Sequence, residues 1–92
     1  ISTFASGLAT GVGVPTTQRI LRGGLDDFIL VSDAELRAAM CLMATAAHTL
    51  CEGAGAAGLA AILADRDRAG TVAFACTGAN ASADELRDLA AA

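Results

Sequence analysis

Apolar residues along this chain form two continuous runs and several helical repeats. The runs are Asp27–Ser32, DFILVS, and Thr71–Ala75, TVAFA. Continuous apolar runs of this length are typical of strands that are covered on both faces of a sheet. Between the runs, apolar residues recur every three or four positions, which predicts a long helix from after Ser32 to about position 50. The predicted core stripe of this helix consists of Leu36, Met40, Met43 and Ala47.

Helix starts are marked by two capping boxes. In Ser32–Glu35 the serine oxygen can accept from the third amide of the helix, and the glutamate can reach back to the serine amide. Ser82–Glu85 repeats this pattern and predicts a last helix over ELRDLAAA. Pro15 suits a first helical turn, so a helix is predicted through Arg22, where two glycines end it.

Two further stretches are rich in glycine. Residues 1–14 are predicted to form a short strand or extended entry and then a glycine-rich loop. Cys51–Ala64, CEGAGAAGLAAILA, is predicted to be a buried helix whose small residues let another backbone come close. If this helix begins just after Glu52, the carboxylate lies at the positive end of the helix dipole.

The predicted order is strand, helix, helix, strand, helix. This order implies an α/β fold with parallel strands covered by helices. Ligands bind such sheets at the carboxyl ends of the strands. Thr77 and Asn80, in the turn after the second run, are predicted to lie at that edge, together with the N-terminus of the Glu52 helix.

The charge of the chain argues against nucleic acid as a partner. The 92 residues carry a net charge of −4, and all six basic residues are arginines scattered among acids, without a basic patch. Asp65–Arg68, DRDR, is predicted to be a solvated charge cluster, followed by a turn at Gly70. Aromatic residues make up only 3% of the chain, so the core is built from small side chains, and we expect the chain to be part of a larger protein.

Cysteine and histidine usage indicates a reducing compartment and no metal site. The three cysteines, Cys41, Cys51 and Cys76, have no CxxC spacing, which favours reduced thiols in a cytoplasmic protein. With a single histidine, His48, a zinc site is not expected, and the histidine is interpreted as a surface or helix-capping residue. We expect no membrane span, because apolar runs long enough to cross a bilayer are interrupted by charges or helix breakers.

A dinucleotide-binding module is an alternative from a different class. Gly53, Gly55 and Gly58 have the spacing G-x-G-x-x-G, in which glycines let a backbone approach a pyrophosphate. That fingerprint requires a strand before it and an acidic residue about 20 positions after it. Here the preceding segment is predicted to be helical, and position 78 is a glycine.

Four stretches together resemble one enzyme family. They are Thr3–Gly13 (TFASGLATGVG), Gly24–Leu36 (GLDDFILVSDAEL), Glu52–Ala61 (EGAGAAGLAA) and Val72–Asn80 (VAFACTGAN). In this order they are similar to the C-terminal part of the fold-type II pyridoxal-phosphate enzymes of the threonine/serine dehydratase group. The resemblance implies that residues 1–92 are the C-terminal segment of the cofactor-binding large domain of a tryptophan synthase β-like fold.

The resemblance implies pyridoxal 5'-phosphate as cofactor and assigns roles to four positions. A hydroxyl or thiol in the final turn faces the pyridine nitrogen in this family; the matching residue is Thr77, with Cys76 as the alternative and Gly78 beside them. Glu52 matches an acidic residue near the same edge of the ring. From the residues alone, Thr77 can also be a turn hydroxyl, and Glu52 a helix-terminal charge without ligand contact.

The implied activity is deamination of threonine or serine by β-elimination, giving a 2-oxo acid and ammonia. A racemase, a hydroxyaspartate ammonia-lyase or a diamino-acid ammonia-lyase would share these segments. The Schiff-base lysine of the family has no counterpart, because the 92 residues contain no lysine. No catalytic residue is therefore expected within the chain, whose partners would be the N-terminal remainder of the enzyme, a second copy in a homodimer or homotetramer, and a small amino-acid substrate. Ser6 stands where some members have a cation-binding aspartate, so no metal site is expected.

Overall fold

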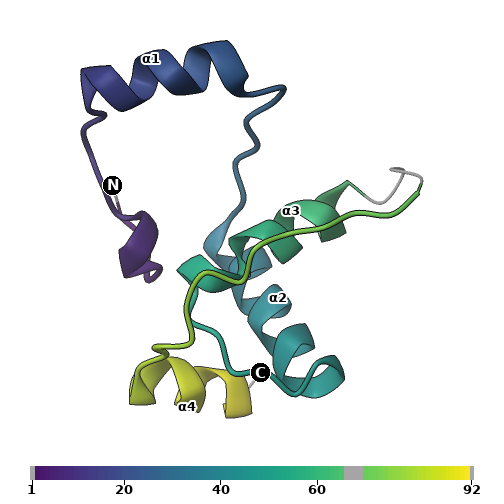
Figure 1. The fold of residues 1–92 in the computed structure, drawn as a ribbon. Coiled ribbons are helices and arrows are strands. Elements are labelled where there is room, and N and C mark those ends of the chain that lie inside the picture. The colour runs from purple at the N-terminus through teal and green to yellow at the C-terminus, as the bar shows by residue number, and fades with distance from the viewer. Residues whose placement is uncertain (1, 66–69, 92) are drawn as a thin grey trace.

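The computed structural model describes residues 2–65 and 70–91. Two short 3-10 helices and four α-helices follow one another along the chain (Figure 1). Their bounds are η1 Ser6–Leu8, α1 Pro15–Gly24, α2 Asp33–Ala46, η2 Ala54–Ala56, α3 Ala57–Ala64 and α4 Ala83–Ala91. Helices were predicted at four of these places, and all four α-helices are present.

Helix α2 begins at the predicted capping box. The Glu35 amide donates to the Ser32 hydroxyl at 3.1 Å, and the Ser32 amide donates to the Glu35 carboxylate at 3.0 Å. The Ser32 amide, which donates to the carboxylate, and after it the Ser32 side chain lower the pKa of Glu35, because they stabilise the ionised carboxylate. The helix ends at Ala46, several residues earlier than predicted, and His48 follows in a left-handed conformation with φ of 51°.

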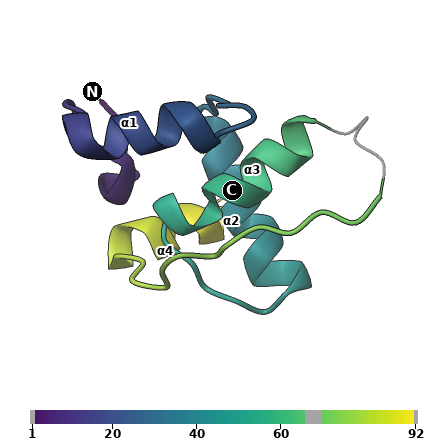
Figure 2. The ribbon, with the colours of Figure 1, turned by 45° about the horizontal axis from the view of Figure 1, so that its top comes forward.

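The core lies between α2 and the region of η2 and α3, which cross closely in both views (Figures 1 and 2). Its buried side chains are small or flexible: Ala5, Leu36, Ala39, Met40, Met43, Cys51, Ala56 and Ala60. Three members of the predicted stripe are therefore in the core. The fourth, Ala47, is exposed, because the helix has already ended before it.

The N-terminal segment, predicted as a short strand or extended entry before a glycine-rich loop, contains η1 at Ser6–Leu8 and no strand among residues 2–14, and it is bound to the start of α2. The Thr3 hydroxyl and the Phe4 amide both donate to the Asp33 carboxylate, the latter at 3.4 Å. The Arg37 guanidinium lies 4.3 Å from the centroid of the Phe4 ring, a cation–π contact. These contacts place Ala5 in the core.

Neither predicted strand is present within the described part of the chain. Residues 27–32 and 71–75 follow extended paths without strand pairing (Figure 1). Phe28 and Leu30 are 74% and 86% exposed. A strand needs a neighbour to receive its backbone hydrogen bonds, and within the described residues neither segment has one. The parallel-strand α/β architecture is therefore not confirmed.

Two smaller predictions concern the loop after α3. Of the expected charge cluster, Asp65 is described, whereas residues 66–68 lie outside the described residues. Gly70 has φ of +90°, a left-handed conformation that suits glycine, in agreement with the predicted turn.

Candidate functional site

The predicted site residues come from two segments that meet at η2, just before α3. One is the approach to η2, residues 51–56, and the other is the turn after the second apolar run, residues 76–80. The Glu52 amide donates to the Gly78 carbonyl at 3.2 Å. This bond joins segments that are far apart in sequence, and it places the start of the glycine-rich stretch against the last turn.

Glycines make this close approach possible. A Cβ added to Gly55 would lie 2.5 Å from the Gly78 carbonyl oxygen, which is closer than real side chains come. A Cβ added to Gly78 would collide with the Glu52 carboxylate. The absence of side chains at both positions thus leaves room for the two backbones and for the Glu52 carboxylate between them.

Helix α4 stabilises the same junction through its capping glutamate. Glu85 completes the predicted box, since its amide donates to the Ser82 hydroxyl at 3.1 Å and the Ser82 amide donates to its carboxylate at 3.3 Å. The other carboxylate oxygen accepts from the Gly53 amide at 2.9 Å. One side chain therefore caps α4 and holds the chain just after Glu52.

Two cysteines lie next to this junction in the chain. The Cys51 side chain is buried and the Cys76 side chain is exposed. Burial, and then the neighbouring Cys76, raise the pKa of the Cys51 thiol. Each cysteine directly precedes a predicted site residue, Glu52 in one segment and Thr77 in the other.

The structure thus brings Glu52 and Gly78 together, and Thr77 directly precedes Gly78 in the chain. Glu52 is half-buried, whereas Cys76 and Thr77 are exposed. The sequence alone did not reveal the part of Glu85 in this junction: its capping box marked a helix start but carried no signal for the bond to Gly53.

The three glycines of the dinucleotide spacing face protein rather than open space. Cβ atoms added to Gly53 and Gly58 would collide with the side chains of Phe4 and Phe74, and Gly55 lies against Gly78. The segment before Gly53 contains no strand. In this chain the glycines serve close packing, so the structure gives no support to the dinucleotide-binding alternative.

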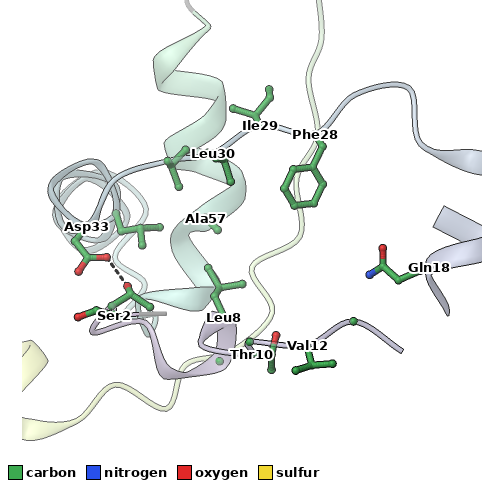
Figure 3. A pocket seen from close by; sticks show the side chains of 16 residues that line it. Ser2, Leu8, Thr10, Val12, Gln18, Phe28, Ile29, Leu30, Asp33 and Ala57 are labelled. Carbon is green, nitrogen blue, oxygen red and sulfur yellow. Dashed lines mark hydrogen bonds between the residues drawn. The ribbon is translucent and has the colours of Figure 1, made fainter. Parts of the chain in front are cut away.

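A larger hollow lies elsewhere, between the N-terminal segment and residues 28–31 (Figure 3). Its volume is about 790 Å³, and Leu8, Phe28 and Leu30 contribute apolar side chains to it. Its single charged lining residue is Asp33, whose carboxylate already accepts from Thr3 and Phe4. This hollow is therefore an open surface of mixed apolar and uncharged polar side chains, and its one carboxylate already accepts hydrogen bonds from Thr3 and Phe4.

No three potential metal-ligating side chains cluster together among residues 2–65 and 70–91. Ser6, at the position of the family's cation-binding aspartate, is exposed in η1. Within the described helices, none combines the length and apolar character needed to cross a bilayer.

Comparison with known proteins assigns the family. The chain matches the family described as pyridoxal-phosphate dependent enzyme over residues 1–78, which is most of its length. Neither a curated protein nor a solved structure matches it. Members of this family have fold type II and bind pyridoxal 5'-phosphate. The chain belongs to the family of pyridoxal-phosphate-dependent enzymes.

Proposed function

We propose that this chain is part of a pyridoxal-phosphate-dependent lyase that deaminates threonine or serine. The observation that carries the proposal is the family match over residues 1–78, joined to the four ordered stretches that resemble the dehydratase group. In the reaction the substrate loses its α-proton and its β-hydroxyl, and hydrolysis then gives a 2-oxo acid and ammonia.

The bound cofactor supplies an electron sink for the carbanion formed at the substrate α-carbon. We assign Thr77 to the pyridine nitrogen of that group. A neutral hydroxyl does not force the ring nitrogen to remain protonated, as a carboxylate would, and a weaker electron sink suits elimination. Gly78 lets the Glu52 carboxylate lie against the turn that carries Thr77, because a side chain at position 78 would occupy the space of that carboxylate.

Cys76 is the alternative at this position, and both side chains are exposed in this chain. Side chains of neighbouring residues in an extended segment point to opposite sides, so only one of the two can face the ring. Thr77 is preferred because it is the residue that matches the hydroxyl of the family's final turn.

Glu52 is assigned a positioning role at the same edge. Its backbone amide is held by Gly78 and its carboxylate lies against that residue, so its position depends on the turn that carries Thr77. The carboxylate is half-buried and is thereby oriented more firmly than a surface acid. Loss of this carboxylate is expected to weaken cofactor binding rather than to abolish proton transfer.

The lysine that binds the cofactor is supplied from outside these 92 residues, because every basic residue here is an arginine. We assign it to the N-terminal remainder of the same enzyme, working in the cytoplasm as a homodimer or homotetramer. The extended apolar residues 27–32 and 71–75 are then the strands of this chain that pair with that remainder to complete the sheet.

Substitution of Thr77 in the complete, cofactor-loaded enzyme tests the proposal. Thr77→Asp is expected to lower kcat for 2-oxo acid formation at least about tenfold while the visible absorbance of bound cofactor persists, because the carboxylate keeps the ring nitrogen protonated. Thr77→Ser keeps the hydroxyl and is the matched control, expected near the wild-type rate. Unchanged turnover in Thr77→Asp would remove Thr77 from the site.

The substrate is tested separately with the wild-type enzyme. With either threonine or serine as substrate, one 2-oxo acid is expected for each ammonia released. Inversion of serine without release of ammonia would assign the chain to a racemase instead. Ammonia release only from hydroxyaspartate or a diamino acid would assign it to one of the related ammonia-lyases.

A further inference from the structure

We propose that Glu85 is a positioning residue for cofactor binding, which fixes Glu52 and the turn that carries Thr77 at the edge of the cofactor. The inference rests on the proposed place of Glu52 and Thr77, and it adds a residue of the last helix, α4, to that site. Glu85 acts through the backbone, because its carboxylate accepts from the amide of Gly53, the residue that follows Glu52.

The backbone of Glu52 is held on both sides of its Cα. The Glu52 amide donates to the Gly78 carbonyl at 3.2 Å, and the next amide, that of Gly53, donates to the Glu85 carboxylate at 2.9 Å. The two peptide planes that flank Glu52 are thus bound to two different segments, and together they restrict both of its backbone dihedrals. The direction of the Glu52 side chain, which lies against Gly78, therefore depends on both bonds.

Glu85 holds Gly53 from a helix that is anchored in the core. One oxygen of its carboxylate accepts from the Ser82 amide at 3.3 Å, and the other accepts from the Gly53 amide. The first bond fixes the side chain relative to α4, and Leu89 of the same helix packs against the core. Gly53 is buried and Glu85 is half-buried. A shielded hydrogen bond to a carboxylate is stronger than an exposed bond to a neutral oxygen, so this contact can hold the segment in place.

The capping box of α2 provides the comparison. Glu35 is exposed, and its carboxylate accepts from the Ser32 amide at the start of its own helix. Glu85 makes the equivalent bond within its box and also binds an amide 32 positions away. Capping α4 does not require this second bond, whereas holding the chain beside Glu52 does.

Hydrogen exchange in the complete protein without cofactor tests the contact itself. Glu85→Gln keeps the size of the side chain but has one acceptor oxygen in place of two, so the Gly53 amide is expected to exchange about tenfold faster. Ser82→Ala removes the hydroxyl of the box and leaves both carboxylate oxygens, so Gly53 exchange is expected to stay within about twofold of the wild type. Unchanged exchange in Glu85→Gln, or equal acceleration in both variants, would overturn the proposal.

The dissociation constant of pyridoxal 5'-phosphate tests the positioning role. The complete apoenzyme is titrated with the cofactor and followed by visible absorbance. Glu85→Gln is expected to raise the Kd about tenfold, because Glu52 loses one of its two supports. Glu35→Gln makes the same change in the box of α2 and is the matched control, expected within about twofold of the wild type. An unchanged Kd in Glu85→Gln beside faster Gly53 exchange would reduce Glu85 to a structural residue.

Failure of this inference can be told apart from failure of the proposed function. A wild-type enzyme that binds the cofactor but releases no ammonia from an amino acid refutes the lyase proposal and leaves the comparison of Kd values valid. An active threonine or serine lyase with the same Kd in the wild type and in Glu85→Gln refutes only the role of Glu85.

Discussion

Helices α1 and α2 both have a start signal in the sequence, but only α2 buries side chains in the core. Both have a clear start signal, Pro15 for α1 and the Ser32 box for α2. Helix α2 buries four residues against η2 and α3. Helix α1 buries none, and its Ile20 remains 69% exposed. In Figure 1, α1 lies at the end of two extended arms, apart from the other helices.

Packing of an apolar face stabilises α2, whereas α1 depends on its own residues alone. A helix as short as α1 is marginal in water without a packed face. Its exposed apolar residues continue into Phe28 and Leu30, which are also exposed. An apolar surface of this kind marks an interaction site. We infer that the remainder of the enzyme, which would carry the lysine, covers the apolar face of α1.

The largest difference is expected between matched truncations in the two helices. Met40→Ala removes a fully buried side chain of α2 and should lower the free energy of unfolding by about 2–5 kcal/mol. Ile20→Ala in α1 should change it by less than about 0.5 kcal/mol in the 92-residue chain. Urea unfolding followed by circular dichroism measures both. In the complete enzyme, Ile20→Ala should cost at least about 1 kcal/mol; an equally small effect there would contradict the inference that α1 is covered.

Glycine substitutions should have opposite signs in the two regions. Gly55→Ala would place a Cβ against the Gly78 carbonyl and should destabilise the chain by about 1–3 kcal/mol, because backbone must move. Gly23→Ala in α1 meets nothing within 4 Å and should stabilise by about 0.4–1 kcal/mol through helix propensity. Thermal unfolding of both variants measures the pair. A neutral Gly55→Ala would show that the turn at Gly78 is not held against η2.

Substitutions at the N-caps of the two helices are expected to change stability by smaller amounts. Ser32→Ala removes the hydroxyl that accepts from Glu35 and should cost about 1 kcal/mol. The N-cap of α1 is Val14, which has no side-chain bond, so Val14→Ser should stabilise α1 by up to about 1 kcal/mol. Amide hydrogen exchange within each helix is the measurement. Equal protection of α1 in Val14→Ser and in the wild type would show that the start of α1 does not limit its stability.

The smallest effect expected is a pH dependence of the α2 cap. The pKa of Glu35 is lowered in the folded chain, so its contribution to stability is complete above its usual pKa of about 4.3 and is lost as pH falls through the lowered value. NMR titration of the Glu35 carboxylate should show this depression in the wild type. In Ser32→Ala the backbone amide, the larger cause, remains, so the pKa should rise only part of the way to its usual value. A Glu35 titration that is identical in both proteins would show that the Ser32 side chain does not contribute to the lowered pKa.

Where local chemistry determines an element, the sequence was sufficient to predict it. Both capping boxes, the proline start of α1 and the core positions Leu36, Met40 and Met43 are confirmed. Each depends on residues within one helical turn or on one repeating face. The family, too, was identified from motifs along the chain.

The strand predictions illustrate the opposite case. The runs at residues 27–32 and 71–75 have the composition of buried strands, but a strand exists only where a second segment accepts its hydrogen bonds. No such partner is present within the described residues. The composition of these segments therefore indicates that they can form strands, but only pairing with another segment makes them strands.

By itself the sequence determined the helix starts, the apolar faces, the lack of lysine and the family, because these follow from residue identity and short spacing. That Glu52 meets Gly78 and that Glu85 reaches Gly53 depends instead on how distant segments pack in three dimensions. Those contacts join residues more than 20 positions apart, and they arise because small residues let two backbones come close. No local pattern of residues specifies which distant backbone will fill such a space.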